Sequence, residues 1–340
     1  IPDREMQEWV DNTITRIQAL HPERVLEIGC GTGLLLFRLA PQCISYMGTD
    51  FSETALDYVH QQLNQSSLHL PQVSLDQRRA DDFEGIQPKS FDTVILNSVL
   101  QYFPSVDYLL EVLEQAVQVI KPGGSLFIGD IRSYLLLEAF AVSVEVSRAS
   151  DDLSVRELWQ NIHNRLHHEE ELTLDPAFFT ALQQRLPQIT QVQILLKRGK
   201  FQNELTPFRY DVILQIGSTP DPSIEYPELD WQKQQLTISK LQQVLQDECP
   251  QAFVVSRIPN RRVLTAVNAV KLLKDSNCPA SAGKLRQELA QVNRQKGIDP
   301  EDFWQLSQTL PYDVTVSWMN SDTEGSYQVL FQQKSLNPHP

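Results

Sequence analysis

The fold of this chain is decided by one stretch, Val25-Leu26-Glu27-Ile28-Gly29-Cys30-Gly31-Thr32-Gly33. Its apolar residues predict a short buried strand, and three glycines at alternate positions follow directly. Residues 34–39 then have the composition of the beginning of a helix. Glycine lets a backbone come close to a ligand, and the free N–H groups of a first helical turn favour an acceptor or an anion. The stretch therefore predicts a strand, a turn and a helix that cradle a nucleotide-sized ligand.

An acidic residue ends the second predicted strand. This strand, residues 45–50, finishes at Asp50, roughly 20 residues after Gly29, which is the usual spacing for an acid that binds ribose. In a doubly wound sheet the second strand lies beside the first, so the Asp50 carboxylate can accept hydrogen bonds from both ribose hydroxyls. A glycine turn alone would fit an ordinary strand-to-helix connection equally well. The acid at this distance favours a nucleotide site.

Three further features follow in the order that such a sheet requires. Acids come after the third strand in Arg79-Ala80-Asp81-Asp82-Phe83, residues 91–98 form the fourth strand, and a Lys121-Pro122-Gly123-Gly124 turn introduces the fifth, which ends at Asp130. Either acid of the first segment could accept a hydrogen bond from an adenine amino group, with the phenylalanine against the ring. Strands that alternate with helices predict a parallel sheet with ligands at the carboxyl ends of the strands.

These five features together resemble the core of the class I S-adenosylmethionine-dependent methyltransferases, with the glycine turn as motif I. The resemblance implies a Rossmann-like α/β core that binds S-adenosylmethionine and releases S-adenosylhomocysteine. The cofactor-binding residues that it implies are Glu27, Gly29, Cys30, Gly31, Gly33, Asp50, Phe51, Asp81, Asp82, Phe83, Asn97, Ser98 and Tyr102.

A narrower resemblance lies in Asn203-Glu204-Leu205-Thr206-Pro207-Phe208-Arg209-Tyr210. This segment is similar to the N-E-L-[ST]-x-[YF]-R-Y signature of methyltransferase domains in nonribosomal peptide synthetases and hybrid polyketide synthases. The resemblance implies methyl transfer to a heteroatom of an intermediate that an acyl or peptidyl carrier protein presents on a phosphopantetheine arm, among neighbouring synthase domains. Other segments that resemble the same family, and extend the likeness over nearly the whole chain, are 34–41, 129–133, 169–179, 258–261 and 311–314.

Three residues are candidates for the acceptor chemistry: Glu204, Asp130 and Tyr210. Glu204 could take a proton from the acceptor or orient a base, and a solvated loop carboxylate is the alternative. Asp130 ends the fifth strand, where ligands bind in sheets of this kind. Arg132 is expected to anchor the segment that follows. Asp211 could be half of a surface ion pair with the nearby arginine of the signature.

The acceptor atom is left open between oxygen and nitrogen, with a slight preference for a hydroxyl oxygen. An amine needs only to be neutral, whereas a hydroxyl needs a base near the forming bond. Some relatives carry a histidine where this chain has Ala141. The alanine argues against a histidine–glutamate pair at this place. The N-methylating relatives are embedded within an adenylation domain, and this sequence shows no flanking halves of such a domain. The preference for oxygen rests on this observation. A non-catalytic scaffold that binds cofactor or carrier is the alternative of another class, and the complete glycine and acid set argues against it.

Composition sets further limits on the function. The 340 residues carry a formal charge of −14, which disfavours a nucleic-acid substrate. Four cysteines without CxxC spacing predict neither disulfides nor a metal site, and they favour the reducing cytoplasm. No apolar stretch is long enough to span a membrane and no signal peptide opens the chain. A start at Ile1 instead of methionine favours a domain of a longer protein.

The chain is expected to divide into a core at 1–218, with a helical lid inserted at about 131–180, and a smaller α+β lobe at 219–340. Pro-rich residues 218–222 would connect them. Lid and lobe are expected to form two walls of the acceptor entrance. Helices are expected at 3–20, 54–64, 106–119, 134–147, 155–171, 237–246, 264–274 and 282–292, and one more after Pro176. Later strands are expected at 192–197, 210–216, 253–256, 314–318 and 328–332.

Overall fold

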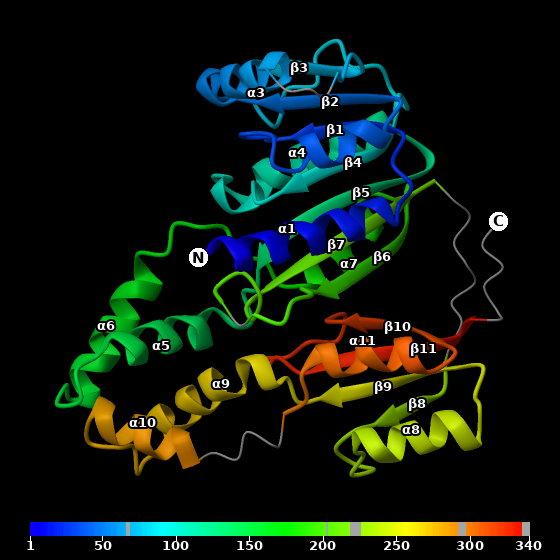
Figure 1. The fold of residues 1–340 in the computed structure, drawn as a ribbon. Helices are drawn as coiled ribbons and strands as arrows, with labels where there is room; N and C mark the ends of the chain where they lie inside the picture. The colour runs from blue at the N-terminus through cyan, green and yellow to red at the C-terminus, as the bar shows by residue number, and fades with distance from the viewer. Residues whose placement is uncertain (66–68, 202, 218–225, 292–296, 335–340) are drawn as a thin grey trace. The chain divides into compact units, whose positions relative to one another are not determined.

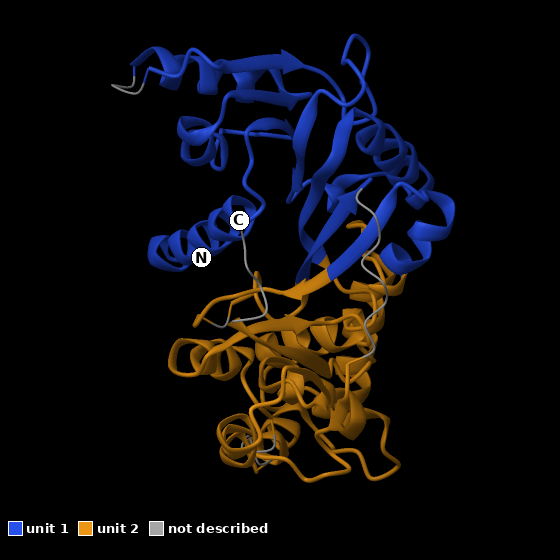
Figure 2. Ribbon diagram, turned by 90° about the vertical axis from the view of Figure 1, so that its right-hand side faces the viewer, with its two compact units in different colours: residues 1–131, 178–193, 210–223 blue, residues 132–177, 194–209, 224–340 orange. Residues whose placement is uncertain are grey.

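A computed structural model describes residues 1–65, 69–201, 203–217, 226–291 and 297–334. The chain divides into two compact units, which Figure 2 colours separately. Unit 1 consists of residues 1–131, 178–193 and 210–223, and unit 2 of residues 132–177, 194–209 and 224–340. The connection expected at 218–222 lies outside the described residues. The division into a core and a lobe at this connection therefore stays a prediction.

Unit 1 is built on a sheet whose strands follow the order β3-β2-β1-β4-β5-β7-β6 (Figure 1). The first five strands pair in parallel, and β1 lies between β2 and β4. Chain order therefore reverses beside β1, which is where open α/β sheets bind ligands. This arrangement confirms the predicted Rossmann-like core. The strand bounds are β1 Arg24–Ile28, β2 Ser45–Asp50, β3 Val73–Gln77, β4 Phe91–Asn97, β5 Ile120–Arg132, β6 Ile189–Leu196 and β7 Arg209–Ile216.

The helices of unit 1 follow the apolar periodicity of the sequence. In α4 (Val106–Val119), Ser105 caps the first turn by accepting a 3.1 Å hydrogen bond from the Tyr108 N–H, and one apolar face is buried. The N-terminal helix α1 (Asp3–Gln18) buries Trp9 and Ile17 among other residues. The remaining helices that contribute to this unit are α2 Leu36–Leu39, α3 Glu53–Gln65 and α7 Ala177–Arg185.

A buried carboxylate fastens α1 to the sheet. Asp211 on β7 accepts a 2.9 Å hydrogen bond from the Asp130 N–H on β5 and forms an ion pair with Arg16 of α1. The alternative of a surface ion pair for Asp211 is therefore wrong. The Asp211 side chain is buried, and a buried charge requires close partners.

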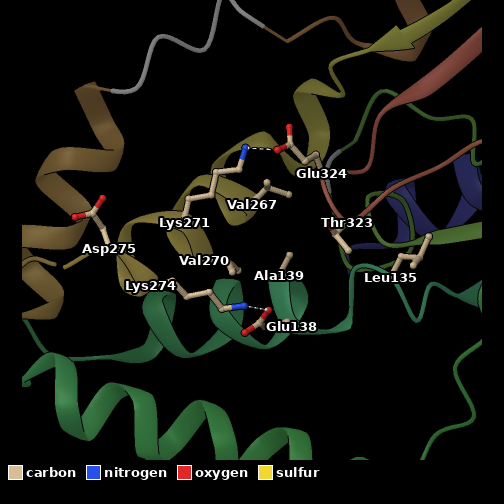
Figure 3. Close-up of a pocket in the computed structure, with 10 residues that line it drawn as sticks. All are labelled: Leu135, Glu138, Ala139, Val267, Val270, Lys271, Lys274, Asp275, Thr323 and Glu324. Atoms are coloured by element: carbon tan, nitrogen blue, oxygen red, sulfur yellow. Dashed lines mark hydrogen bonds and ion pairs between the residues drawn. The ribbon is translucent and has the colours of Figure 1, made fainter. Parts of the chain in front are cut away.

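Four helices form one apolar core in unit 2: α5 (Leu137–Arg148), α6 (Val155–His167), α9 (Arg261–Lys274) and α10 (Ala282–Gln291). Leu158, Ile162 and Leu285 are completely buried in it. Two ion pairs flank a surface cavity beside α5 and α9 (Figure 3): Lys274 with Glu138 at 2.6 Å and Lys271 with Glu324 at 2.5 Å. The helical insertion and the helices of the C-terminal segment thus share a core.

The predicted helix over 155–171 is too long. Helix α6 ends at His167, and the next residues leave the helix to bind Arg132. The Arg132 guanidinium donates two hydrogen bonds of 2.8 Å to the Glu169 carboxylate and one of 2.9 Å to the Glu171 carboxylate. Arg132 therefore anchors this segment, as expected.

A second sheet region in unit 2 has the strand order β10-β11-β9-β8. Strand β11 pairs antiparallel with β10 and β9, and β8 pairs parallel with β9. Phe303 packs its ring against Tyr327 and Phe331, which fixes α11 on this sheet. The sequence missed β8 and α11. The bounds are β8 Glu228–Asp230, β9 Ala252–Ile258, β10 Tyr312–Ser317, β11 Tyr327–Gln333, α8 Ile238–Asp247 and α11 Pro300–Thr309.

Within the described ranges, no helix combines the length and the apolar character that crossing a membrane requires.

Candidate functional site

The glycine turn after β1 adopts a conformation that few other residues tolerate. The φ angles of Gly29, Gly31 and Gly33 are 75°, 52° and 78°, in the left-handed region. The N–H groups of Gly29 and Cys30 donate to the Thr49 carbonyl at 2.7 and 2.9 Å. The turn is therefore fastened to the end of β2, the strand that carries the predicted ribose acid.

Asp50 is held in place by backbone donors. Its Oδ2 accepts from the Gly31 N–H at 2.8 Å and its Oδ1 accepts from the Ser52 N–H at 2.9 Å. The side chain is largely buried. Each carboxylate oxygen has a second lone pair, so Asp50 retains acceptor capacity for a ligand hydroxyl.

A cavity of about 420 Å³ opens beside this turn, at the carboxyl ends of β1, β2 and β4. Phe51 and Tyr102 stand at it with 77% and 72% of their surfaces exposed. Six of the predicted cofactor residues line it: Gly29, Gly31, Asp50, Phe51, Ser98 and Tyr102. The sequence did not single out the other residues that line it: Ile28, Arg78, Arg79, Ala80, Val99, Phe103, Pro104 and Tyr108.

Glu27 lies behind the cavity and does not line it. Its Oε2 accepts a 2.8 Å hydrogen bond from the Tyr46 hydroxyl. Burial raises the pKa of Glu27 to about 7; the hydrogen bond from Tyr46 opposes this rise and the charge of Asp50 adds to it. Glu27 is therefore a carboxyl group whose protonation changes near neutral pH.

Asp81 supports the far wall of the cavity from outside. It accepts hydrogen bonds from the Tyr108 hydroxyl at 2.8 Å and from Arg79 at 3.0 and 3.1 Å. Burial acts to raise the pKa of Asp81, but these hydrogen bonds hold it below its usual value. Asp82 is exposed, and neither it nor Phe83 lines the cavity.

The remaining predicted cofactor residues lie close to the turn without lining the cavity. Cys30 is buried, and burial raises the pKa of its thiol well above the usual value, so it stays a neutral thiol. A Cβ on Gly33 would meet the ring of Phe37 at 2.7 Å, so this glycine serves packing. Asn97 is buried, and its Oδ1 has no hydrogen-bond partner among the described residues.

The three candidates for acceptor chemistry have different surroundings. Asp130 has a φ of 68° and accepts a 3.0 Å hydrogen bond from the Ser98 hydroxyl, beside the cofactor cavity. Tyr210 is completely buried in unit 1, with its ring 6.3 Å from that of Phe179. Glu204 is exposed and lines a different cavity, in unit 2. Asp130 thus contacts Ser98, a residue that lines the cofactor cavity.

Comparisons with known proteins agree with this geometry. The methyltransferase-domain family matches residues 26–126, which include the glycine turn and Asp50. The chondramide synthase cmdD of Chondromyces crocatus is 43% identical over 334 residues, 97% of this chain and 8% of that protein. This chain is an S-adenosylmethionine-dependent methyltransferase domain.

Two further similarities concern a longer protein and a solved structure. The nonribosomal peptide synthetase asqK of Emericella nidulans is 30% identical over 98% of the methyltransferase domain and 13% of its own length. The crystal structure of N-methyltransferase NodS from Bradyrhizobium japonicum WM9 is 17% identical, with 62% of this chain and 97% of that chain covered at a TM-score of 0.42. The domain thus spans only a small part of the chondramide synthase and of asqK.

The cavity fits S-adenosylmethionine in size and chemistry. A Cβ built on Gly31 meets no atom within 4 Å, so the space above this glycine is open to a ligand. Asp50 offers acceptor oxygens for ribose hydroxyls, and the exposed rings of Phe51 and Tyr102 offer faces for an adenine base. Among the described residues, no group of three or more metal-ligating side chains is found.

Replacing Gly31 with alanine should weaken cofactor binding without unfolding the domain. The new methyl group would enter the cavity. An alanine at the positive φ of Gly31 would also cost about 1 kcal/mol in stability. Gly123→Ala is a matched control, because Gly123 also has a positive φ (84°) and open space but does not line the cavity. Calorimetry should show a loss of affinity for S-adenosylhomocysteine of at least tenfold only for Gly31→Ala. Equal affinities of the two variants would contradict this.

Glu27→Gln should alter the pH dependence of stability. The folded state holds the Glu27 proton up to about pH 7, whereas the unfolded state loses it near 4.5. The stabilisation from this group is therefore complete below pH 4.5 and is lost as pH rises through 7. Between pH 5 and 8 the free energy of unfolding should fall less in Glu27→Gln than in the wild type, by up to about 3 kcal/mol. Urea titrations at four pH values measure this, with the exposed Glu53→Gln as control. Parallel profiles for Glu27→Gln and wild type would disprove the assignment.

Proposed function

We propose that this domain transfers the methyl group of S-adenosylmethionine to the amine of an aminoacyl group that is tethered to a carrier protein. The observation that carries the proposal is the similarity, over nearly the whole chain, to proteins that are named as nonribosomal peptide synthetases, such as asqK. Such synthetases handle amino acids, whose shared nucleophile is the α-amine. The carrier protein and neighbouring synthase domains would be its partners, in the cytoplasm.

The cofactor side of the reaction would be managed by the cavity of unit 1. When bound, S-adenosylmethionine supplies an electrophilic methyl group on a sulfonium. Asp50 would hold the ribose hydroxyls, and the backbone at Gly29 and Gly31 would approach the methionine end. Glu27 and Asp81 would act through neighbours, since Glu27 binds Tyr46 and Asp81 orients Tyr108 and Arg79. Positioning and exclusion of water are the main tasks of such residues.

The chemistry of the cavity favours an amine over a hydroxyl acceptor. A hydroxyl needs a general base close to the forming bond, whereas an α-amine, with a pKa of roughly 8, needs only to be neutral. The residues that line the cofactor cavity include one carboxylate, Asp50, which backbone N–H groups already bind, and no histidine. The preference for oxygen depends on the lack of adenylation-domain segments on either side. The chain matches only 8% of the chondramide synthase, so this lack does not bear on the acceptor. Nitrogen is therefore the better assignment.

The acceptor can be tested directly by intact-mass spectrometry. Carrier proteins loaded with a leucyl group or with a 3-hydroxyacyl group would each be incubated with the domain and S-adenosylmethionine. Only the leucyl carrier should gain one methyl group, and the Gly31→Ala variant should transfer none. Methylation of the hydroxyacyl carrier alone would overturn the nitrogen assignment. Transfer to neither carrier would contradict a tethered acceptor.

A further inference from the structure

Unit 2 contains two cavities of opposite character that share Phe208 as a wall. The first, about 300 Å³, is lined by Glu204, Phe140 and several charged side chains. The second, about 430 Å³, is lined largely by small or apolar residues of α5, α9 and α10, among them Ser143, Ala266, Ala269, Leu289 and Ala290. We call them the polar cavity and the apolar cavity. Two adjoining recesses of this kind suit a ligand that carries a polar and an apolar substituent on one carbon atom.

An aromatic pair separates the two cavities. The rings of Phe140 and Phe208 meet edge to face with centroids 5.4 Å apart, and the Arg132 guanidinium lies 4.8 Å from the centre of the Phe140 ring. Phe140, Ser143 and Ser147 are three and four residues apart on α5, so they share one helix face. This face runs from the polar cavity into the apolar cavity.

Glu204 is the acceptor that the polar cavity leaves available. Arg132 is neutralised by Glu169 and Glu171 as described above. Arg165 is bound by Glu145 at 2.7 Å. The exposed Glu204 carboxylate makes no hydrogen bond or ion pair with another described residue. It can therefore accept a hydrogen bond from an N–H group of a ligand.

The serines and arginines that line the apolar cavity are already hydrogen-bonded within the protein. The hydroxyls of Ser143 and Ser147 donate at 2.7 Å to carbonyls of their own helix. The Arg262 guanidinium donates to the carbonyls of Lys197 and Gly199 and to Asp299. The remaining cation of the lining, Arg286, donates to a carbonyl of α5 and to a carboxylate. These arginines therefore present their aliphatic methylene groups to the cavity. The cavity suits an aliphatic group of a ligand.

We propose that the two cavities together recognise the aminoacyl group, with Glu204 accepting from the α-amine and the apolar cavity holding a branched aliphatic side chain. Amine and side chain are bonded to the same α carbon, so one residue can fill both recesses only if they adjoin, as they do at Phe208. Ser143 and Ala290, small residues in the lining, set the size of side chain accepted. The inference rests on the proposed function, and it assigns the class of amino acid.

Binding can be measured without methyl transfer. The probes are three stable pantetheine amides, carrying a leucyl, an alanyl or a 4-methylpentanoyl group, of which the last lacks the amine. Calorimetry with the complete chain should show that the leucyl amide binds at least tenfold more tightly than the alanyl amide, because the apolar cavity holds three additional carbons. It should also bind more tightly than the 4-methylpentanoyl amide, because only the leucyl amide offers an N–H to Glu204.

Variants assign each preference to its cavity. Ser143→Leu and, on the exposed surface of α10, Ala290→Leu should each fill the apolar cavity and reduce the leucyl-to-alanyl affinity ratio by at least fivefold. Glu204→Gln should reduce only the preference for the leucyl over the 4-methylpentanoyl amide. Ser307→Leu is the matched control: Ser307 is a half-buried helix serine that also donates at 2.7 Å to a carbonyl three residues earlier.

Two results would overturn the inference: wild-type protein without a preference for the leucyl amide, or folded Ser143→Leu and Ala290→Leu variants with the wild-type ratio. The ratio does not depend on turnover. A domain that shows these binding preferences but methylates another acceptor would therefore overturn the proposed function and leave the recognition site standing.

Discussion

The cofactor cavity depends on the hydrogen bonds that fasten the glycine turn to the end of β2. Three consecutive N–H groups, those of Gly29, Cys30 and Gly31, donate to the Thr49 carbonyl and the Asp50 carboxylate. Only a turn with positive φ angles can direct them in this way. The same contacts hold the Asp50 carboxylate beside the cavity, and the space above Gly31 is open. The turn and the acid that form this part of the cavity therefore come from the ends of two adjoining parallel strands, β1 and β2.

Several ionisable side chains are buried in unit 1 near the carboxyl ends of the strands, and the burial of such groups opposes folding. Glu27 lies behind the turn with Tyr46, and Asp211 binds both Arg16 and the backbone of Asp130. A buried charge without partners would destabilise the fold by several kcal/mol, so each group is found with hydrogen bonds.

Much of the fold could be predicted from local pattern, because its central strands are short apolar runs that end in glycine or acid. The bounds of β2 and α4 agree with the prediction. The end of α6 could not be predicted, since Glu169 leaves the helix for Arg132, a residue distant in sequence. Strand β8 has only three residues, and α11 begins at Pro300 with few apolar residues to mark its period.

The lining of the cavity was predictable at Gly31 and Asp50, which local pattern brings together; that they bind a cofactor stays a prediction. The lining was not predictable where side chains from separate elements meet. Tyr108 reaches the cavity from α4 and binds Asp81, one of the two acids that the sequence offered as an acceptor for the adenine amino group. No signal near Tyr108 indicates this contact.

We propose that Asp50 joins the glycine turn to the ribose of the bound cofactor. The affinity for S-adenosylmethionine would be determined by calorimetry for the wild type, for Asp50→Asn and for the exposed control Asp57→Asn. Loss of a charged acceptor should weaken binding by about 1–3 kcal/mol in Asp50→Asn, roughly 5- to 150-fold, and leave Asp57→Asn unchanged. Wild-type affinity in a folded Asp50→Asn protein would contradict the claim.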